Sequence, residues 1–414
     1  MGEDGPVNLV ASTVQEIEHL LPYLLECRLN GRGANIIYGV PPSPSAVIRL
    51  RSICERLTQE TAKAAKNRAI QQQTDLAPIL FLVDSVDQLR ELKRLKTSGM
   101  WDNICVFIKI DAGYHRSGVK EDSSSFAKML DICANNVTID NPDKPADTVS
   151  SMEYKLEGLY CHSGHSYGSS STEEALEFLE GELTALRNAA ELASSKGLGK
   201  LVLSVGATPT TTSAQNLFSS SSEAAKRVCK LIDDLKKDHT VELHAGVYPL
   251  LDMQQLATHA RPSTAGDGTP MASLSAKNLG LRMLVEVASV YDDREKPEAL
   301  IGAGTLALGR EPCKAYPGWG VVASNLSNSD QDMQVYSEDD PTGWIVGRIA
   351  QEHGILTWQG DLSKKTNLKY GDKLLLWPNH ACVAGAGFGW YIIVDSRSDN
   401  ANEVRDVWVR WRGW

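Results

Sequence analysis

Short apolar runs alternate with helical patterns from residue 7 to about residue 258, and this alternation restricts the fold more than any other feature of the sequence. The runs are rich in Val, Ile and Leu with little polar alternation, as in parallel strands that are covered on both faces. We expect seven strands here: Val7–Ala11, Asn35–Tyr38, Ile79–Val83, Ile104–Ile110, Leu156–Cys161, Leu201–Val205 and Val241–His244. Repeated strand-then-helix units predict a parallel sheet, either open and doubly wound or closed as a barrel.

Helices begin between these strands at three capping boxes, Thr13-x-x-Glu16, Ser85-x-x-Gln88 and Ser171-x-x-Glu174. The resulting seven units are one fewer than a (β/α)8 barrel needs. Because the sequence also begins almost directly with a strand, we expect that the first βα unit of a barrel is missing. An open sheet would explain the same count.

The composition changes after His259. Residues 260–278 are rich in Pro, Gly, Ser and Thr, which predicts a linker. Beyond it we expect strands alone: Arg282–Tyr291, Ala299–Leu308, Trp344–Gln351, Lys373–Trp377, Tyr391–Asp395 and Val404–Trp411. Eight of the nine tryptophans lie between Trp319 and Trp414, which indicates a separate aromatic core. We therefore predict two domains, an incomplete barrel at 1–275 and a C-terminal β domain at 276–414.

The charge balance argues against nucleic acid as a partner. The formal net charge is −10, from 42 Lys and Arg against 52 Asp and Glu, and no long basic cluster offsets it. Residues 1–6 do not resemble a secretory signal, and no apolar run approaches the roughly 20 residues that span a bilayer. The eight cysteines lack Cys-x-x-Cys spacing. Reduced buried thiols and a cytoplasmic location are the expectation.

Four consecutive strand ends carry glycine beside Arg, His, Tyr or Thr. Glycines allow close backbone approach, hydroxyl and N–H groups bind phosphate, and aromatic groups flank a ring. The loops therefore predict a site for a small anionic ring ligand at the carboxyl edge of the sheet. Glycine and threonine are also ordinary in βα turns, so one such loop alone would mean little. The four loops are Asp111–Gly118, Tyr160–Tyr167, Ser204–Thr210 and Glu242–Pro249.

A second candidate site lies in the β region, at His380 and Cys382. Alternate residues of an extended segment face the same side, so this imidazole and thiol could meet at one metal ion. The pair favours zinc over magnesium or calcium. A buried thiol beside a hydrogen-bonded histidine is the commoner cause of such spacing. Glu352-His353 is interpreted as a turn.

Eight sequence blocks occur in an order that resembles the D-serine dehydratase branch of the alanine-racemase-like fold, which also includes D-threonine aldolases. They are IDAGYHRSG, GLYCHSGHSYG, SVGATPT, ELHAGVYP, IGAGTLALGRE, AQEHG, YGDKLLLWPNHAC and the closing WVRWRGW. The resemblance runs from about residue 7 to the C-terminus. It implies a pyridoxal-phosphate-binding barrel of the alanine racemase type, followed by a β domain with a metal site.

The resemblance also implies a role for each candidate residue. Arg116 matches the contact to the phenolic oxygen of pyridoxal phosphate, Tyr160 and Tyr167 match cofactor-contacting tyrosines, and His162 is expected near the ring. Thr208 and the backbone at Gly246–Val247 match the phosphate cradle, although the family pattern leads us to expect Asn at position 247. His380 and Cys382 match the zinc ligands.

One departure concerns catalysis. Family members carry a Schiff-base lysine in an Arg-Pro-His-x-Lys-Thr-His-like setting, and this motif is absent from the sequence. Lys109 lies in a different block and is not expected to replace it. The family activity would convert D-serine to pyruvate and ammonia with pyridoxal phosphate and zinc, in homodimers. The chain as printed is expected to be inactive, through truncation or as a vitamin-B6-binding pseudoenzyme; D-threonine aldolase activity is the alternative on the same fold.

Overall fold

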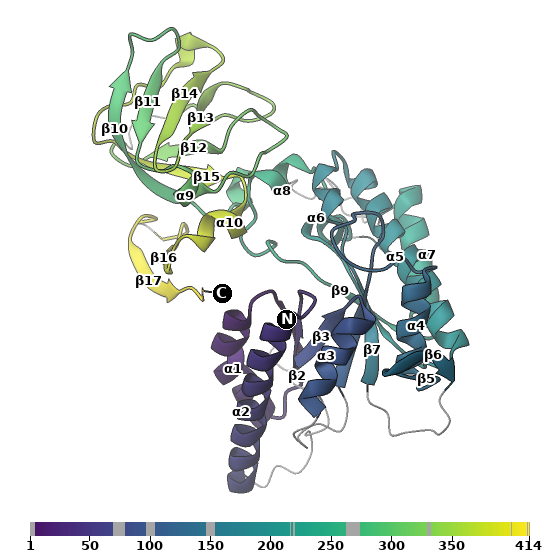
Figure 1. Cartoon of the computed structure of the whole chain (residues 1–414). Coiled ribbons are helices and arrows are strands. Elements are labelled where there is room, and N and C mark those ends of the chain that lie inside the picture. Colours follow the sequence, from purple (N-terminus) through teal and green to yellow (C-terminus); the bar gives the residue numbers. More distant parts are fainter. Residues whose placement is uncertain are drawn as a thin grey trace.

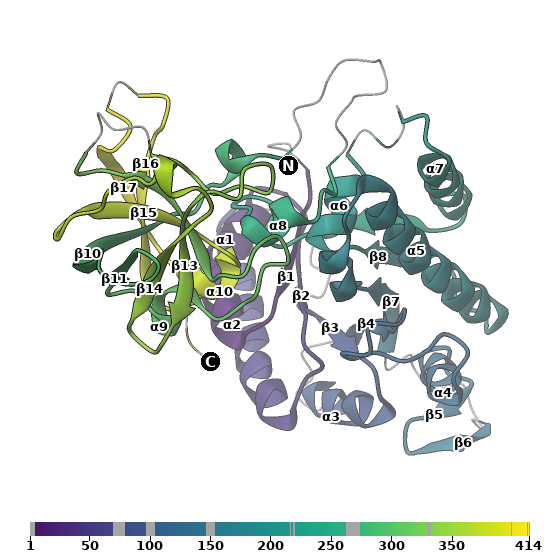
Figure 2. The same cartoon turned by 90° about the horizontal axis from the view of Figure 1, so that it is seen from above.

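The computed structural model describes residues 5–68, 79–96, 104–145, 154–215, 217, 220–261, 274–328, 333–398, 400–411 and 413. Two bodies are visible in Figure 1, a layered α/β domain and an antiparallel β domain beside it. In Figure 2, seen from above, the β domain again lies to one side of the α/β domain. Among the described residues, no helix is long and apolar enough to cross a membrane.

The α/β domain is built on a parallel sheet with the strand order β1-β2-β3-β4-β7-β8-β9. Its strands are β1 (Val7–Ala11), β2 (Ala34–Tyr38), β3 (Ile79–Val83), β4 (Ile104–Ile110), β7 (Tyr154–Cys161), β8 (Val202–Val205) and β9 (Thr240–Leu243). All seven expected strands are present, because each is an apolar run between two helices. The edge strands β1 and β9 approach each other through side chains, with Asn8 Nδ2 donating to Glu242 Oε2 at 3.0 Å. The sheet thus curves enough to bring its two edge strands within hydrogen-bonding distance of each other.

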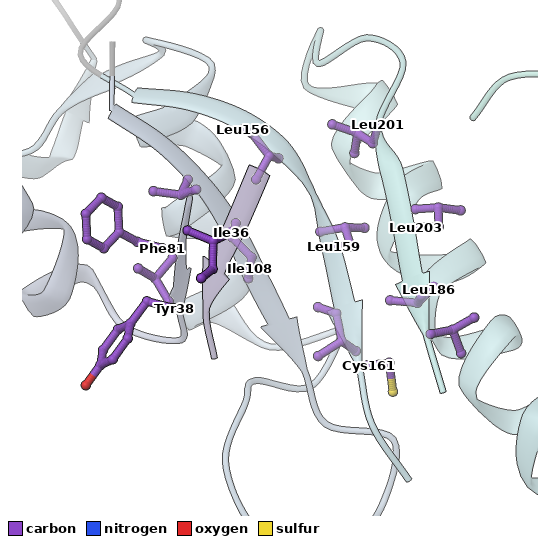
Figure 3. Packing of buried hydrophobic residues seen from close by; sticks show 14 of the residues in the cluster. Ile36, Tyr38, Phe81, Ile108, Leu156, Leu159, Cys161, Leu186, Leu201 and Leu203 are labelled. Carbon is purple, nitrogen blue, oxygen red and sulfur yellow. The ribbon is translucent and has the colours of Figure 1, made fainter. Parts of the chain in front are cut away.

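Helices cover the outside of this sheet (Figure 2). They are α1 (Val14–Leu29), α2 (Pro44–Arg68), α3 (Val86–Lys96), α4 (Ser124–Cys133), α5 (Thr172–Ser195) and α7 (Glu223–Leu235). Alternate strand residues, among them Ile36, Phe81 and Leu203, pack against these helices in the main core (Figure 3). The intervening residues face inward, where Leu80, Phe107 and others form a smaller cluster that includes Tyr160. This alternation gives the sheet two buried faces.

Local signals explain where the helices start. Thr13 and Glu16 form a complete capping box at α1, and Ser85 and Gln88 exchange the same bonds at α3. At α5 the Ser171 hydroxyl accepts from Glu174 N, but the Glu174 carboxylate accepts from Ser170 N instead. The short hairpin β5 (Val137–Thr138) and β6 (Asn141–Pro145) was not expected, since these residues are largely polar.

The β domain is a closed antiparallel barrel with the order β10-β11-β14-β13-β12-β15. Its strands are β10 (Met283–Tyr291), β11 (Glu298–Ile301), β12 (Gly320–Asn325), β13 (Gly343–Ile349), β14 (Gly354–Gln359) and β15 (Lys373–Pro378). The prediction of one strand over Ala299–Leu308 was wrong, because α9 (Thr305–Leu308) follows β11 after a turn at Gly304. Strands β12 and β14 were missed. Glu352 and His353 lie in the turn between β13 and β14, as interpreted.

The hairpin β16 (Trp390–Val394) and β17 (Val404–Val409) stands apart from the closed barrel. It leads the chain back toward the N-terminal helices, close to α1 in Figure 1. The Trp411 indole stacks on the His19 imidazole with ring centroids 6.2 Å apart. The C-terminal segment therefore ties the β domain to the first βα unit.

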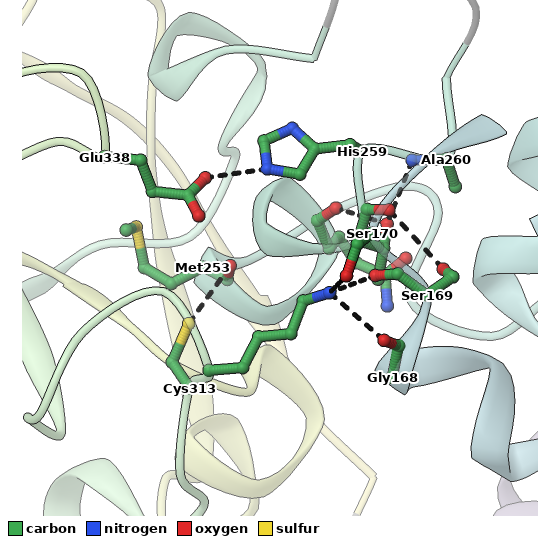
Figure 4. Close-up of polar contacts among 11 residues, drawn as sticks. Gly168, Ser169, Ser170, Met253, His259, Ala260, Cys313 and Glu338 are labelled. Atoms are coloured by element: carbon green, nitrogen blue, oxygen red, sulfur yellow. Dashed lines mark hydrogen bonds and ion pairs between the residues drawn. The ribbon is translucent and has the colours of Figure 1, made fainter. Parts of the chain in front are cut away.

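Polar bonds join the two domains elsewhere. Lys314 Nζ, from the β domain, donates to Gly168 O at 3.2 Å, to Ser170 Oγ at 2.8 Å and also to Ser169 O. His259 Nε2 lies 2.9 Å from the Glu338 carboxylate (Figure 4). An apolar cluster that includes Met253, Leu279, Tyr316 and Ile345 fills the contact between them.

Candidate functional site

Aromatic side chains from the ends of β7 and β9 stack at the carboxyl edge of the barrel. The Tyr160 and His244 rings lie 4.2 Å apart with planes 9° from parallel. His162 continues the stack, with its ring 5.9 Å from His244. Its Nδ1 bonds Gly206 O at 2.8 Å, which fixes the ring orientation. Two of these residues were predicted, and His244 was quoted only within its loop.

The stack is electrically neutral at pH 7. Burial and, to a smaller extent, the nearby Arg116 and Lys109 charges lower the pKa of His162 to about 4. Burial likewise lowers the pKa of His244 well below its usual value and raises that of Tyr160. The Ser204 hydroxyl lies between His244 Nδ1 at 3.0 Å and the Glu242 carboxylate at 2.8 Å. The buried His244 Nε2 has no hydrogen-bond partner among the described residues, so one polar atom of the stack is left for a ligand.

Lys109 lies in the barrel interior next to this stack. It is 4% exposed, and its Nζ is 5.4 Å from the centre of the Tyr160 ring. Burial lowers its pKa, and Arg116 acts in the same direction. No role was expected for this lysine from the sequence, because it lies in a different block from the family's Schiff-base motif.

The predicted phosphate cradle is assembled from two loops. Thr208 begins the short helix α6 (Thr208–Ser213), and its hydroxyl accepts a 3.2 Å bond from Val247 N. Gly206 has a φ of +140°, and a Cβ there would lie 2.4 Å from His244 O. Only glycine suits this position. The structure therefore brings Thr208 and Gly246–Val247 together, as expected.

A buried carboxyl lies behind the same loops. Glu182, on α5, accepts a 2.6 Å bond from Ser163 N, next to His162. Burial raises its pKa to about 8, against the opposing effect of bonds from Ser163, Thr210 and Gly206. Glu182 joins the loop after β7 to the loop after β8, and sequence reasoning missed it because it occupies an ordinary helical position.

Arg116 lies on the loop after β4. Asp111 organises this loop, since its carboxylate accepts bonds from the backbone N–H groups of Gly113 at 3.1 Å and His115 at 2.9 Å. The Arg116 guanidinium is exposed and lies 5.3 Å from the centre of the Tyr114 ring. Its positive charge lowers the pKa of both Tyr160 and His162, so it lies within electrostatic range of the stack.

His380 and Cys382 follow the C-terminal end of β15, on the side of the β domain that contacts the α/β domain. His380 is the extended N-cap of helix α10 (Ala381–Ala386), and Cys382 is already within that helix. The expectation that both lie on one extended segment was therefore wrong; a strand-to-helix junction carries the pair. Among the described residues, no group of three or more His, Cys, Asp and Glu side chains could hold a metal ion.

The barrel holds this junction at two points. The Tyr167 ring, on the turn η1 (Gly164–Gly168), stacks on His380 with centroids 6.2 Å apart and planes 13° from parallel. Asp252 caps helix α8 (Met253–Ala257) and accepts a 2.9 Å bond from Ala381 N. Cys382 is exposed, yet desolvation by the surrounding protein raises the pKa of its thiol, and Asp252 adds to this effect. Asp252 was not predicted, since nothing in the sequence links it to residue 381.

Comparisons with known proteins agree with this geometry. Residues 61–223 match the alanine racemase N-terminal domain, and residues 280–394 match the serine dehydratase domain. The D-serine dehydratase of Schizosaccharomyces pombe is 28% identical over 421 residues, covering 100% of this chain and 81% of that protein. The Saccharomyces cerevisiae D-serine dehydratase is 31% identical over 338 residues, covering 80% and 68%.

Solved structures show the same fold. D-threo-3-hydroxyaspartate dehydratase from Delftia sp. HT23 has a TM-score of 0.63 at 23% identity, covering 98% of this chain and 84% of that one. D-threonine aldolase from Filomicrobium marinum has a TM-score of 0.59 at 16% identity, covering 97% and 81%. Both domains, the order of the sequence blocks and the two yeast enzymes lead to one assignment. The chain belongs to the D-serine dehydratase family, the pyridoxal-phosphate-dependent lyases of the alanine racemase fold.

Proposed function

We propose that this protein is a pyridoxal-phosphate- and zinc-dependent D-serine ammonia-lyase, which converts D-serine to pyruvate and ammonia. The stacking of Tyr167 on His380 is the observation that carries the proposal. It brings a cofactor-contacting residue of the barrel next to a metal-ligating residue of the β domain. A β-elimination needs both, since the Cα proton and the β-hydroxyl leave neighbouring carbons.

The barrel residues fit the cofactor. The Thr208 hydroxyl, which the Val247 amide holds in place, and the backbone at Gly246 would bind the phosphate. The buried, unpartnered Nε2 of His244 and the neutral Tyr160–His244–His162 stack suit a flat heteroaromatic ring. Arg116 would bind the phenolic oxygen. Bound there, pyridoxal phosphate supplies an electron sink for the substrate's Cα.

His380 and Cys382 fit zinc as a catalytic ion, because two protein donors leave coordination positions for water and substrate. Two structures of the related D-threo-3-hydroxyaspartate dehydratase support this pair. One is of a histidine-to-alanine mutant, and the other is of a cysteine-to-alanine mutant in the metal-free form. The two mutated residues are two positions apart, as His380 and Cys382 are. A cytoplasmic homodimer is part of the same proposal.

The residues of the chain would divide the work between them. Tyr167 and Asp252 hold the metal pair against the barrel, whereas Glu182 and Gly206 hold the cofactor loops. The neutral histidines keep positive charge away from the ring. No residue of the printed chain stands in the family's Arg-Pro-His-x-Lys-Thr-His setting, so we propose that these 414 residues alone do not complete turnover.

The test compares the printed chain with a version extended by a strand that carries the family's Arg-Pro-His-x-Lys-Thr-His-like motif. With pyridoxal phosphate and zinc, the extended protein should release pyruvate from D-serine faster than glycine from D-threonine, and neither L-enantiomer should react. EDTA should abolish turnover and zinc should restore it. Preferential glycine release would favour the aldolase alternative. Cofactor binding without turnover in the extended protein would favour a pseudoenzyme.

A further inference from the structure

Arg410 lies directly after β17, and its side chain packs on the helix that carries Cys382. Its backbone N donates to Gly389 O at 2.9 Å, and its Cζ is 5.9 Å from the centre of the Tyr391 ring. A Cβ on Gly385 of α10 would lie 2.7 Å from Tyr391 Oη and 3.3 Å from Arg410 Nη1. The absence of a side chain at Gly385 therefore lets the guanidinium lie flat against α10.

This guanidinium has no visible partner for its charge. Nη1 of Arg410 is buried and donates no hydrogen bond to any of the residues that the structure describes. Within the same set, no carboxylate forms an ion pair with it. Two arginines nearby in the sequence differ, since Arg405 pairs with Glu403 at 3.1 Å and Arg397 with Asp395 at 3.0 Å. Burial of an uncompensated charge is costly, so an anion is expected at Arg410.

The position of Arg410 indicates which anion. Gly385, on which the guanidinium packs, follows Cys382 by one turn of α10, so Arg410 lies close to the candidate metal pair. Tyr391, beneath it, packs against the cluster of Val247, Leu281 and Ala381. The guanidinium thus lies beside α10, which carries Cys382, and its neighbour Tyr391 reaches the predicted cofactor loop at Val247.

We propose that Arg410 binds the carboxylate of the amino-acid substrate and is a specificity-determining residue of this site. The inference rests on the proposed function. The planar guanidinium matches a carboxylate through two parallel N–H···O bonds. The cofactor phosphate is a poorer match, because Thr208 and backbone amides already form its cradle.

The experiment measures binding by titration calorimetry, with the 414-residue protein loaded with pyridoxal phosphate and zinc. D-serine is compared with serinol, in which a hydroxymethyl group replaces the carboxylate. The wild-type protein should bind D-serine at least about tenfold more tightly than serinol, as expected for a charge-assisted pair. Arg410→Met should remove this preference and Arg410→Lys should restore part of it. Arg405→Met, the control on the same hairpin, should keep it.

Affinity for pyridoxal phosphate, measured separately, should change less than about threefold in Arg410→Met, and matched thermal melting should show that the variant is folded. A preference for D-serine that survives in folded Arg410→Met would overturn the inference and leave the proposed function intact. If Arg410→Met loses affinity for pyridoxal phosphate instead, Arg410 would be assigned to the cofactor phosphate, and the inference would also be overturned. Failure of the wild-type protein to bind D-serine would count against both proposals.

Discussion

The Tyr167 ring lies almost parallel to the His380 ring, with centroids 6.2 Å apart and planes 13° from parallel, although the two residues belong to different domains. Tyr167 also bonds the Thr208 hydroxyl, which opposes the burial that raises its pKa to about 12. One side chain therefore touches both the predicted phosphate cradle and the predicted metal pair. Binding of cofactor and metal should be coupled through it.

This contact can be separated into its two parts. Tyr167→Phe keeps the stacking and loses the hydroxyl, so it should weaken pyridoxal phosphate binding and leave zinc content unchanged. Tyr167→Leu should reduce both pyridoxal phosphate affinity and zinc content. The loss in cofactor affinity should be roughly tenfold, because one polar bond contributes about 1–1.5 kcal/mol. Fluorescence titration and metal analysis provide the two measurements. Equal zinc content in the two variants would show that the ring contact does not support the metal site.

Cys382→Ala should lower zinc content to a small fraction of the wild-type value, because one of two protein ligands is lost. Pyridoxal phosphate affinity should stay within about threefold, since Thr208 and Val247 lie on other segments. Cys229→Ala serves as the control, as this half-buried thiol bonds only Leu217 O. Unchanged zinc in Cys382→Ala, measured by atomic emission after dialysis, would remove this cysteine from the site.

Glu182 predicts a pH dependence of stability. Its pKa is about 8 in the folded protein against a usual 4.5, so the folded state holds its proton more tightly than the unfolded state. Its stabilising contribution is full below pH 4.5 and is lost as the pH rises through about 8. Glu182→Gln should therefore gain stability relative to wild type between pH 5 and pH 8. Urea unfolding at several pH values measures this difference.

The control for that series is Glu180→Gln on the same helix, where the exposed Glu180 pairs with Arg227 at 2.9 Å. This variant should show little pH-dependent difference, because exposed ion pairs contribute roughly 0–1 kcal/mol. If the free energy of unfolding changes with pH in the same way in Glu182→Gln and in wild type, the pKa of Glu182 is not raised and the prediction is wrong.

The printed chain should bind pyridoxal phosphate reversibly. After borohydride reduction, peptide mapping should find no stoichiometric pyridoxyl adduct on any single lysine, because the family's Schiff-base motif is absent. Lys109 is the residue to inspect, since it is buried beside Tyr160 with a lowered pKa. A specific adduct on Lys109 would contradict this prediction and assign the lysine a covalent role.

The sheet of the barrel was readable from the sequence because each strand is a continuous apolar run between capped helices. The β domain was read less well. Strand β12 contains Ser324 and Asn325, and β14 follows a two-residue turn, so neither separates clearly from its surroundings. At 299–308, Gly302 and Gly304 end the strand, but the apolar residues beyond them imitate its continuation.

The site divides in the same way. Thr208 and Val247 could be paired from the loop pattern, since neighbouring parallel strands end at one edge. Asp252 could not, because its bond to Ala381 joins residues 129 positions apart. Arg410 could not, because its neighbours Gly385 and Tyr391 lie on a helix and on another strand. Buried charge in a fold is decided by packing across domains, which local sequence patterns do not encode.

Lys314 and the apolar cluster around Tyr316 make the two domains depend on each other energetically. Each domain has a core of its own and could unfold separately if the contact were weak. With the shared cluster and the lysine contacts in place, scanning calorimetry should record one cooperative transition. Lys314→Met would then split it into two melting events. In such a protein, a substitution on the surface of the β domain that weakens this contact would let the cofactor loops unfold separately from the β domain.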